Sequence, residues 1–299
     1  MPSEGDDLHM LRGQARDEAA MVRGLSVIVP ASDEAATIGY CLAALLESDF
    51  PGDLPVQVVV VANGCRDDTA ARAESFAPRF AARGWRLDVI ERAEGGKPGA
   101  LNAGDARAVG ATRAYLDADV RVSRPLLAQL VTALDRSAPA LASGRVSIPR
   151  PASAVSRAYR RTYRRVPFMT RGVPACGLFA VNRAGRARWG AFPDVISDDT
   201  FVRLHFSPAE RIGVPATYDW PLVEGWSNLV RVRRRQDAGV AEIARRYPEL
   251  LANDDKRRVG PGGALALALR DPPGFAVYAG VAAAVRLTKG RGEGWSRGR

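Results

Sequence analysis

Cysteine and histidine are scarce in this chain of 299 residues, which has three of the former and two of the latter. The cysteines, Cys41, Cys65 and Cys176, are widely spaced and form no Cys-x-x-Cys pair. So few cysteines, odd in number, exclude the disulfide framework of small secreted domains and favour buried thiols in a reducing compartment. We therefore expect a cytoplasmic protein.

Long hydrophobic runs are also missing. The longest apolar run extends from Gly274 to Val285, well short of the ~20 residues that a membrane-spanning helix needs. The first 23 residues are polar and contain no apolar core of a secretory signal. We expect neither a spanning helix nor a signal peptide.

What the chain does have is the composition of an ordinary globular protein, with 46% hydrophobic and 25% charged residues. Its length is enough for one or two domains with a sizeable core. Its 43 Lys and Arg residues exceed its 33 Asp and Glu residues, so the formal net charge is +10. This excess favours anionic partners such as nucleic acid, acidic lipid headgroups or phosphorylated substrates.

Short apolar runs alternate with segments of helical spacing through most of the chain. Strands are expected at Leu25–Val29, Val56–Val61, Arg86–Ile90, Arg113–Leu116, Ala140–Ser147 and Ala175–Val181. Helices are expected from Ser32 or Asp33 to Leu46, from Thr69 to Phe80, after Pro98, and from Pro125 to Leu134. Such alternation predicts an α/β fold whose mostly parallel sheet is flanked by helices. In such sheets ligands bind beyond the carboxyl ends of the strands.

Polar clusters follow three of the expected strands, at residues 32–34, 63–68 and 117–119. In the third, Asp117 and Asp119 flank a single alanine, so an extended chain would point both carboxylates the same way. Two carboxylates this close repel each other unless a cation or donor groups separate them. A hard divalent ion carried by a diphosphate meets that need. The cluster therefore predicts a nucleotide-diphosphate site.

Four segments resemble the motifs of family 2 glycosyltransferases, in the family's order. They are VIVPASDEAATI (residues 27–38), VVVVANGCRDDTA (58–70), GK-x-x-ALN-x-G followed by YLDAD (96–119), and CGLFAVNRAGRARWGAFPDVISDDTFV (176–202). The resemblance covers roughly Leu25 to Gln236. It implies the GT-A fold, Rossmann-like with a C-terminal helical extension, and a hexosyltransferase that inverts the anomeric carbon.

The resemblance also implies roles for particular residues. The donor nucleotide would contact Pro30, Ala31, Asp33, Glu34, Asn63, Asp67, Lys97 and Asp117. Mg²⁺ or Mn²⁺ would bind Asp119 and the diphosphate, with Asp117 on the ribose or in the metal's water shell. Ala62 stands where the family often has an acidic residue, which leaves open whether the donor's nucleobase is uracil or guanine. We expect a UDP-sugar rather than a GDP-sugar.

Asp198 and Asp199 stand in the position of the family's Glu-Asp motif. An attacking hydroxyl needs a base, and a carboxylate with a neighbouring acid is suited to that task because each raises the other's proton affinity. We expect Asp199 to be the base and Asp198 to orient it. The simpler alternative is a helix cap.

The second half contains three basic segments. Ser153–Arg165 is a basic helical stretch, predicted to be either a solvated face or a contact for lipid headgroups or a diphosphate. Arg231 and Arg234 share a helix face and could clamp the donor diphosphate, with a solvated helix as the alternative. The apolar segment ending at Leu287 would dock on its own domain or lie in a membrane interface. With no nucleic-acid fold motif present, we expect no nucleic-acid partner.

These observations divide the chain into an N-terminal arm (1–23), a nucleotide-sugar-binding half (24–150), an acceptor-binding half (151–236) and a C-terminal segment (237–299). We interpret it as a metal-dependent inverting glycosyltransferase acting on a hydroxyl acceptor, which can be lipid-linked. The alternatives are a sugar-phosphate nucleotidyltransferase and a non-catalytic protein of the membrane surface. The inner face of the membrane is the alternative location.

Overall fold

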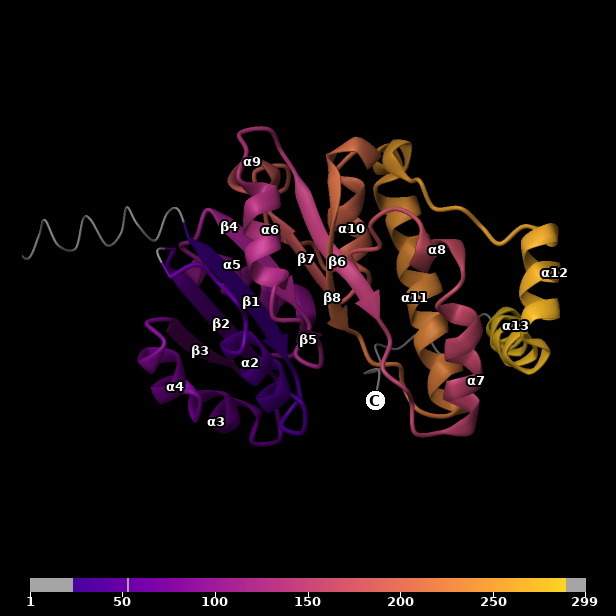
Figure 1. Ribbon diagram of the computed structural model, residues 1–299, viewed down its shortest axis with the longest axis horizontal. Helices are drawn as coiled ribbons and strands as arrows, with labels where there is room; N and C mark the ends of the chain where they lie inside the picture. The colour runs from indigo at the N-terminus through magenta and orange to yellow at the C-terminus, as the bar shows by residue number, and fades with distance from the viewer. Residues whose placement is uncertain (1–23, 53, 289–299) are drawn as a thin grey trace, which may run out of the picture.

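A single eight-stranded sheet forms the centre of the computed structural model, which describes residues 24–52 and 54–288 (Figure 1). Its strands are β1 (Leu25–Ala31), β2 (Val56–Asn63), β3 (Arg86–Arg92), β4 (Thr112–Leu116), β5 (Arg121–Val122), β6 (Leu141–Ser147), β7 (Leu178–Val181) and β8 (Arg211–Asp219). Their order across the sheet is β3-β2-β1-β4-β7-β6-β8-β5. The predicted arm at 1–23 and the tail beyond 288 lie outside the described residues.

The sheet is mixed, with a parallel half and an irregular half. Strands β3, β2, β1 and β4 run parallel, whereas β7 is antiparallel to both β4 and β6. Strand β8 is parallel to β6 and antiparallel to the short β5. Every residue of β2 is buried, as its run of valines predicts for a strand covered on both faces. The predicted α/β architecture is confirmed.

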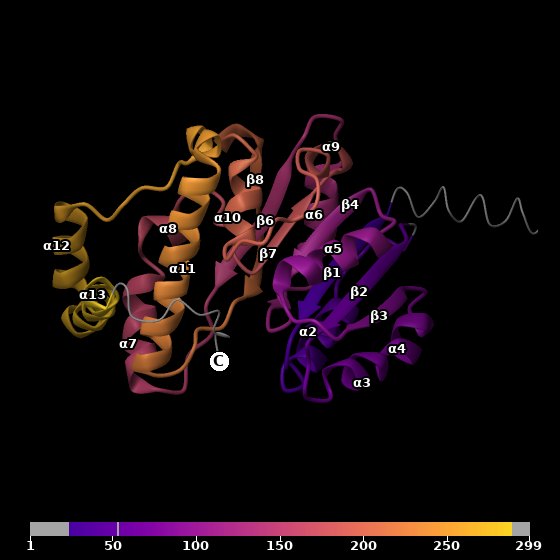
Figure 2. The ribbon, with the colours of Figure 1, turned by 180° about the vertical axis from the view of Figure 1, so that it is seen from behind.

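Helices cover both faces of the sheet. They are α2 (Ile38–Leu46), α3 (Thr69–Glu74), α4 (Ala77–Ala82), α5 (Lys97–Arg107), α6 (Leu126–Leu134), α7 (Ala154–Tyr163), α8 (Pro167–Thr170), α9 (Arg183–Arg186), α10 (Asp198–Leu204), α11 (Trp226–Arg246), α12 (Pro261–Arg270) and α13 (Pro272–Leu287), with 3₁₀ turns η1 (Pro208–Glu210) and η2 (Pro248–Asn253). Helices α2 and α6 pack on one face (Figure 1), and α5 packs on the other (Figure 2). This arrangement leaves the carboxyl ends of the parallel strands open for a site.

Strand β8 was not predicted, because Gly213 and Pro215 interrupt its pattern and both are unfavourable in a strand interior. Strand β7 is shorter than expected and begins at Leu178. Gly177, the residue before it, has φ 74°, which an extended strand does not accommodate.

The C-terminal helices extend the molecule beyond the sheet. Helix α13 buries Val281 and Val285 against α7 and α11, so the apolar C-terminal segment docks on its own domain. Helix α11 runs without a break across residues 236 and 237, where a boundary was predicted. Within residues 24–52 and 54–288, no helix has both the length and the apolar character needed to cross a membrane.

Candidate active site

A cavity of about 910 Å³ opens at the carboxyl ends of the parallel strands. Its walls come from the segments that follow β1, β2, β3 and β4, from the start of α10 and from one side of α11. Among the predicted site residues, those that line it are Pro30, Asp33, Glu34, Asn63, Lys97, Asp117, Asp119, Asp198 and Asp199. The two acid pairs, about 80 residues apart along the chain, therefore share one cavity.

Lys97 connects these acid pairs directly. Its ammonium Nζ lies 2.8 Å from Asp117 Oδ1 and 3.1 Å from Asp198 Oδ1. Burial lowers the lysine pKa, but the nearby carboxylates outweigh that effect and raise it. Lys97 thus stays charged and holds the two sides of the site together.

Asp117 and Asp119 lie in a turn after β4 rather than on the strand itself. The turn is closed by the Val120 amide, which donates to the Asp117 carbonyl at 3.0 Å. Both carboxylates are half-buried and line the cavity, while Ala118 between them is buried. Carboxylate oxygens are the ligands that hard divalent ions prefer, so this pair fits Mg²⁺ or Mn²⁺.

Asp198 and Asp199 form the first turn of α10, where the helix N-terminus favours negative charge. The Asp198 carboxylate is buried, and this burial, with the charges of Asp199 and Asp117 beside it, raises its pKa to about 6 despite the Lys97 ammonium. Asp199 is half-buried, and its carboxylate accepts a hydrogen bond from the Thr200 amide at 2.6 Å. Asp198 is therefore engaged within the protein, and Asp199 is the more open of the two.

Asn63 connects the ends of β1 and β2 to the glycine loop before α5. Its amide nitrogen donates to the Ala31 carbonyl at 2.8 Å, and its oxygen accepts from the Gly96 amide at 2.9 Å. The next residue, Gly64, has φ 57°, and a Cβ there would lie 2.7 Å from the Gly95 Cα. Asn63 and Gly64 therefore fix the glycine loop that precedes Lys97. Ala31 is buried and contributes its carbonyl to this network.

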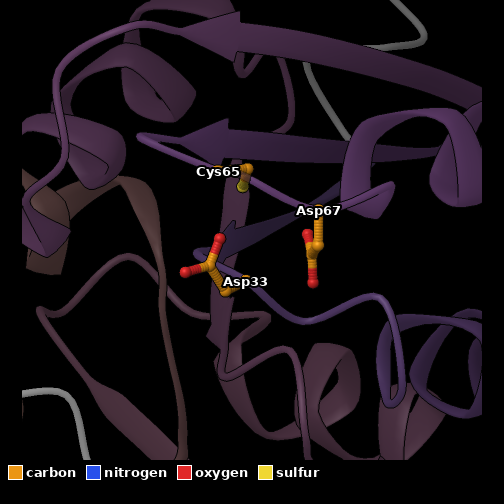
Figure 3. Close-up of side chains that lie close together, drawn as sticks. All are labelled: Asp33, Cys65 and Asp67. Atoms are coloured by element: carbon orange, nitrogen blue, oxygen red, sulfur yellow. The ribbon is translucent and has the colours of Figure 1, made fainter.

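Asp33, Cys65 and Asp67 gather where the loops after β1 and β2 meet (Figure 3). Asp33 accepts from the Arg66 amide at 2.7 Å, and Asp67 accepts from the Ala35 amide at 3.1 Å. Desolvation raises the pKa of the Asp67 carboxyl, but the hydrogen bonds that this exposed side chain accepts outweigh it, so its pKa is lowered. Asp33 lines the cavity, whereas Asp67 is not among the described residues that do.

The arginines of α11 are arranged differently from the prediction. Arg231 and Arg234 share a face, but they are not among the described residues that line the cavity. Arg231 contacts Asn228, and Arg234 contacts Thr288 at the end of α13. Arg233 and Arg235 line the cavity instead. The basic run was visible in the sequence, but nothing in it showed which face of α11 meets the sheet.

Two further residues of the cavity wall were missed from the sequence. Trp220 follows β8, a strand that was not predicted, and lies against Gly177, where a Cβ would be 2.6 Å from the Trp220 Cδ1. The Gly177 carbonyl accepts from the Asp117 amide at 2.9 Å, so this glycine supports the turn that carries the first acid pair. The only sign of these two residues in the sequence was the position of Gly177 between two apolar residues at the start of a strand.

His205 ends α10 and faces the core. Its Nδ1 lies 2.9 Å from the Phe201 carbonyl, and its ring packs on Phe201 and Trp189. Burial lowers the His205 pKa. These contacts agree with a structural histidine.

A family model described as glycosyl transferase family 2 matches residues 26–188, more than half of the chain. The chain belongs to this family. The matched range contains the first three resembling segments and part of the fourth, and the predicted family is confirmed.

Solved structures of two glycosyltransferases share the fold. The mannosyltransferase PcManGT of Pyrobaculum calidifontis, in complex with GDP-Man and Mn²⁺, has a TM-score of 0.55 at 24% identity, covering 90% of this chain and 76% of its own. S. aureus TarS 1–349, in complex with UDP-GlcNAc, has a TM-score of 0.50 at 18% identity, covering 88% and 81%. At these identities the likeness concerns the fold alone.

Two curated relatives match shorter stretches. The 4,4'-diaponeurosporenoate glycosyltransferase of Staphylococcus aureus is 31% identical over 105 residues, which are 34% of this chain and 25% of the relative. Glycosyltransferase AglE of Haloferax volcanii is 30% identical over 128 residues, 42% of this chain and 40% of the relative. This chain thus matches between a quarter and two-fifths of the length of these relatives.

Proposed function

We propose that this protein transfers a sugar from a nucleotide-diphosphate sugar to a hydroxyl acceptor, with inversion at the anomeric carbon. The observation that carries the proposal is the pairing of Asp117 and Asp198 on one ammonium, that of Lys97, inside a single cavity. Family membership and two structural neighbours that hold GDP-Man and UDP-GlcNAc support this donor class. A UDP-sugar as this chain's own donor stays a prediction.

On the donor side, Asp119 and Asp117 would hold Mg²⁺ or Mn²⁺ together with the donor diphosphate. When bound, the ion supplies Lewis-acid stabilisation of the charge on the leaving diphosphate. Lys97 keeps the Asp117 carboxylate in place and adds positive charge beside the leaving group. Arg233 and Arg235, which line the same cavity, are better placed than Arg231 and Arg234 to contact the phosphates.

On the acceptor side, Asp199 would accept the proton of the attacking hydroxyl. Its half-buried carboxylate lines the cavity, while the buried Asp198 next to it is held by Lys97. This division supports Asp199 as the base and Asp198 as the residue that orients the start of α10. A base placed opposite the departing diphosphate leads to inversion.

Neither alternative function explains the whole cavity. A nucleotidyltransferase would release pyrophosphate and would have no use for a second acid pair facing the first. A non-catalytic protein of the membrane surface would need no acids joined through a half-buried lysine. The released product separates these functions, because sugar transfer yields a nucleoside diphosphate.

Asp199→Asn tests the base. We expect transfer to fall by ~100-fold or more, the usual contribution of a positioned base, while nucleotide binding is retained. The measurement is the initial rate of nucleoside diphosphate release, with binding followed by thermal shift. Asp68→Asn, an exposed position outside the cavity, is the control. Unchanged turnover in Asp199→Asn would remove the assignment.

Asp119→Ala tests the metal site. In the wild type we expect Mn²⁺ to increase the thermal shift given by UDP or GDP, because Asp117 and Asp119 would hold the ion beside the nucleotide's diphosphate. The variant should lose that increment and keep the metal-independent part. A panel of UDP, GDP, dTDP and CDP with and without Mn²⁺ shows in the same experiment which nucleobase the site prefers. Equal wild-type shifts with and without Mn²⁺ would contradict the metal role.

A further inference from the structure

A second cavity, of about 270 Å³, lies at the other end of α10 from the acid pair. Its walls are α8 with the loop that follows it (residues 167–174), Arg203 of α10, and residues 255–257 of the linker between η2 and α12. This linker passes over α8 on its way to the outermost helices (Figure 2). The proposed transfer reaction assigns this cavity no role.

The lining of this second cavity is strongly basic. Arg171, Lys256 and Arg257 contribute to it, and no carboxylate of the described residues lies within ion-pair distance of any of the three. The Lys256 ammonium lies 4.9 Å from the centre of the Phe168 ring, a weaker interaction than an ion pair with a carboxylate. These cations are available to a ligand.

One acid, Asp255, also lines this cavity, and both Asp255 and the adjacent Asp254 are already paired with buried arginines. Arg203 lies 2.7 Å from Asp254 and 2.7 Å from Asp255, and Arg211 lies 2.6 Å from the same Asp255 oxygen. Burial, together with the charge of Arg203, lowers the pKa of Lys256. Cations therefore outnumber carboxylates around this small cavity, and a bound dianion would offset most of the excess positive charge.

We propose that this cavity binds a phosphate monoester dianion. Guanidinium groups offer planar paired donors to phosphate oxygens, and a lysine ammonium adds a compact point charge. A volume of 270 Å³ accommodates a phosphate group with part of the molecule that carries it. The excess positive charge favours a doubly charged group over a single carboxylate.

The position of the cavity connects it to the acceptor. Residues 172–174 line this cavity, while Cys176 and Gly177, a few residues further along the chain, line the first one. Arg203 follows Asp199 by four residues on α10, so the phosphate would be held near the proposed base. If the proposed sugar transfer is correct, on which this step rests, the acceptor carries a phosphate monoester. That phosphate can belong to a soluble acceptor or to a lipid headgroup at a bilayer surface, since both present the same chemistry.

Direct binding measurements test the cavity without any need for sugar transfer. Glycerol 3-phosphate is titrated calorimetrically at constant ionic strength, and vesicles of phosphatidylcholine with phosphatidic acid carry the same monoester on a lipid. We expect Lys256→Gln and Arg171→Gln each to weaken phosphate binding by about tenfold or more, the value of a charge-assisted hydrogen bond. Arg72→Gln, an exposed arginine of α3, is the charge-matched control and should bind as the wild type does.

The two probes separate the sources. Lys256-dependent binding of glycerol 3-phosphate supports a soluble phosphate, whereas Lys256-dependent binding of the vesicles alone supports a lipid headgroup. UDP binding should be unchanged in all of these variants, so failure here and failure of the donor site can be distinguished. Equal affinities of Lys256→Gln and Arg72→Gln for both probes would overturn the proposal.

Discussion

Asp198 is a carboxylate that folding makes harder to ionise. Its pKa rises from 3.8 to about 6, with burial as the largest cause. Between these pH values the folded protein keeps a proton that the unfolded chain has released, so stability falls as pH rises through this window. The Lys97 ammonium at 3.1 Å reduces this cost without removing it. Such a cost is typical of active-site acids, which are placed for chemistry rather than for stability.

Asp198→Asn should therefore stabilise the fold at neutral pH. Above pH 6 we expect the variant to be more stable than the wild type by about 1 to 3 kcal/mol, as a shift of this size implies. The difference should shrink toward zero below pH 4, where both side chains are neutral. Urea unfolding at pH 4 and pH 7 measures it, with Asp68→Asn as the exposed control. A wild type more stable than Asp198→Asn at pH 7 would contradict the raised pKa.

At the residue scale, the sequence was sufficient to predict the two acid pairs and the lysine that line the cavity, but not which arginines do. Two adjacent carboxylates repel each other unless a cation or donor groups separate them, so spacing and chemistry were enough to predict that Asp117 and Asp119 belong to one site, and both line the cavity. Arg231 and Arg234 could not be oriented, because four arginines among five successive residues leave the buried face of α11 undetermined. Leu229 and Gln236, seven residues apart, both line the cavity and so mark the side of α11 that faces it. That side is known only from the packing of α11 in the structure.

At the scale of elements, a side chain of α5 holds the loop that leads into α10. The Asn102 amide donates to the Phe192 carbonyl at 3.0 Å, and its oxygen accepts from the Phe192 amide at 2.7 Å. This paired contact ties the loop before Asp198 to the helix that begins at Lys97. The segments that carry Lys97 and Asp198 are thus also connected through the Asn102 side chain.

Asn102→Ala should loosen that loop. Removing both hydrogen bonds leaves two part-buried backbone groups without partners, at a cost of about 1 to 3 kcal/mol. We expect faster hydrogen exchange in residues 190–197 and a lower transfer rate, with donor binding retained. Asn228→Ala removes the hydrogen bonds of Asn228 to the Glu224 carbonyl and to Arg231. It should leave hydrogen exchange in residues 190–197 unchanged. The same exchange rates in Asn102→Ala and the wild type would show that the loop is held elsewhere.

Elements with a strong periodic pattern could be predicted, and the irregular ones could not. The valine and isoleucine runs of β1 and β2 admit only a buried strand at that length. Strand β8 alternates buried and exposed residues, but Gly213 and Pro215 obscure that alternation in the letters alone. Because Trp220 follows β8, its place in the cavity wall could not be predicted from the sequence either.

At the scale of the whole molecule, α12 stands apart from the sheet (Figure 1). None of its residues is buried against the rest of the described chain, and Leu265 and Leu269 are 60% and 75% exposed. Arg270 ends this helix, and Arg286 lies in the last turn of α13. Exposed leucines flanked by cations favour contact with an anionic lipid surface.

Replacing Leu265 and Leu269 by glutamine tests that contact. We expect the double variant to lose most of its co-sedimentation with vesicles containing phosphatidylglycerol, because the apolar surface that would enter the interface is gone. Raised salt should weaken binding of the wild type. Leu251→Gln, which changes a leucine of η2 that is 40% exposed, should still bind. Undiminished sedimentation of the double variant would exclude α12 as the membrane contact.

The position of the Lys97 ammonium implies that ligands bound on the two sides of the site affect each other's affinity. One positive charge is shared between a carboxylate on each side, so any ligand that draws it toward Asp117 leaves Asp198 less compensated, and the reverse also holds. Donor and acceptor affinities are then coupled even without contact between the two substrates. By linkage, the factor by which the first to arrive alters the affinity for the second must equal the factor for the opposite order.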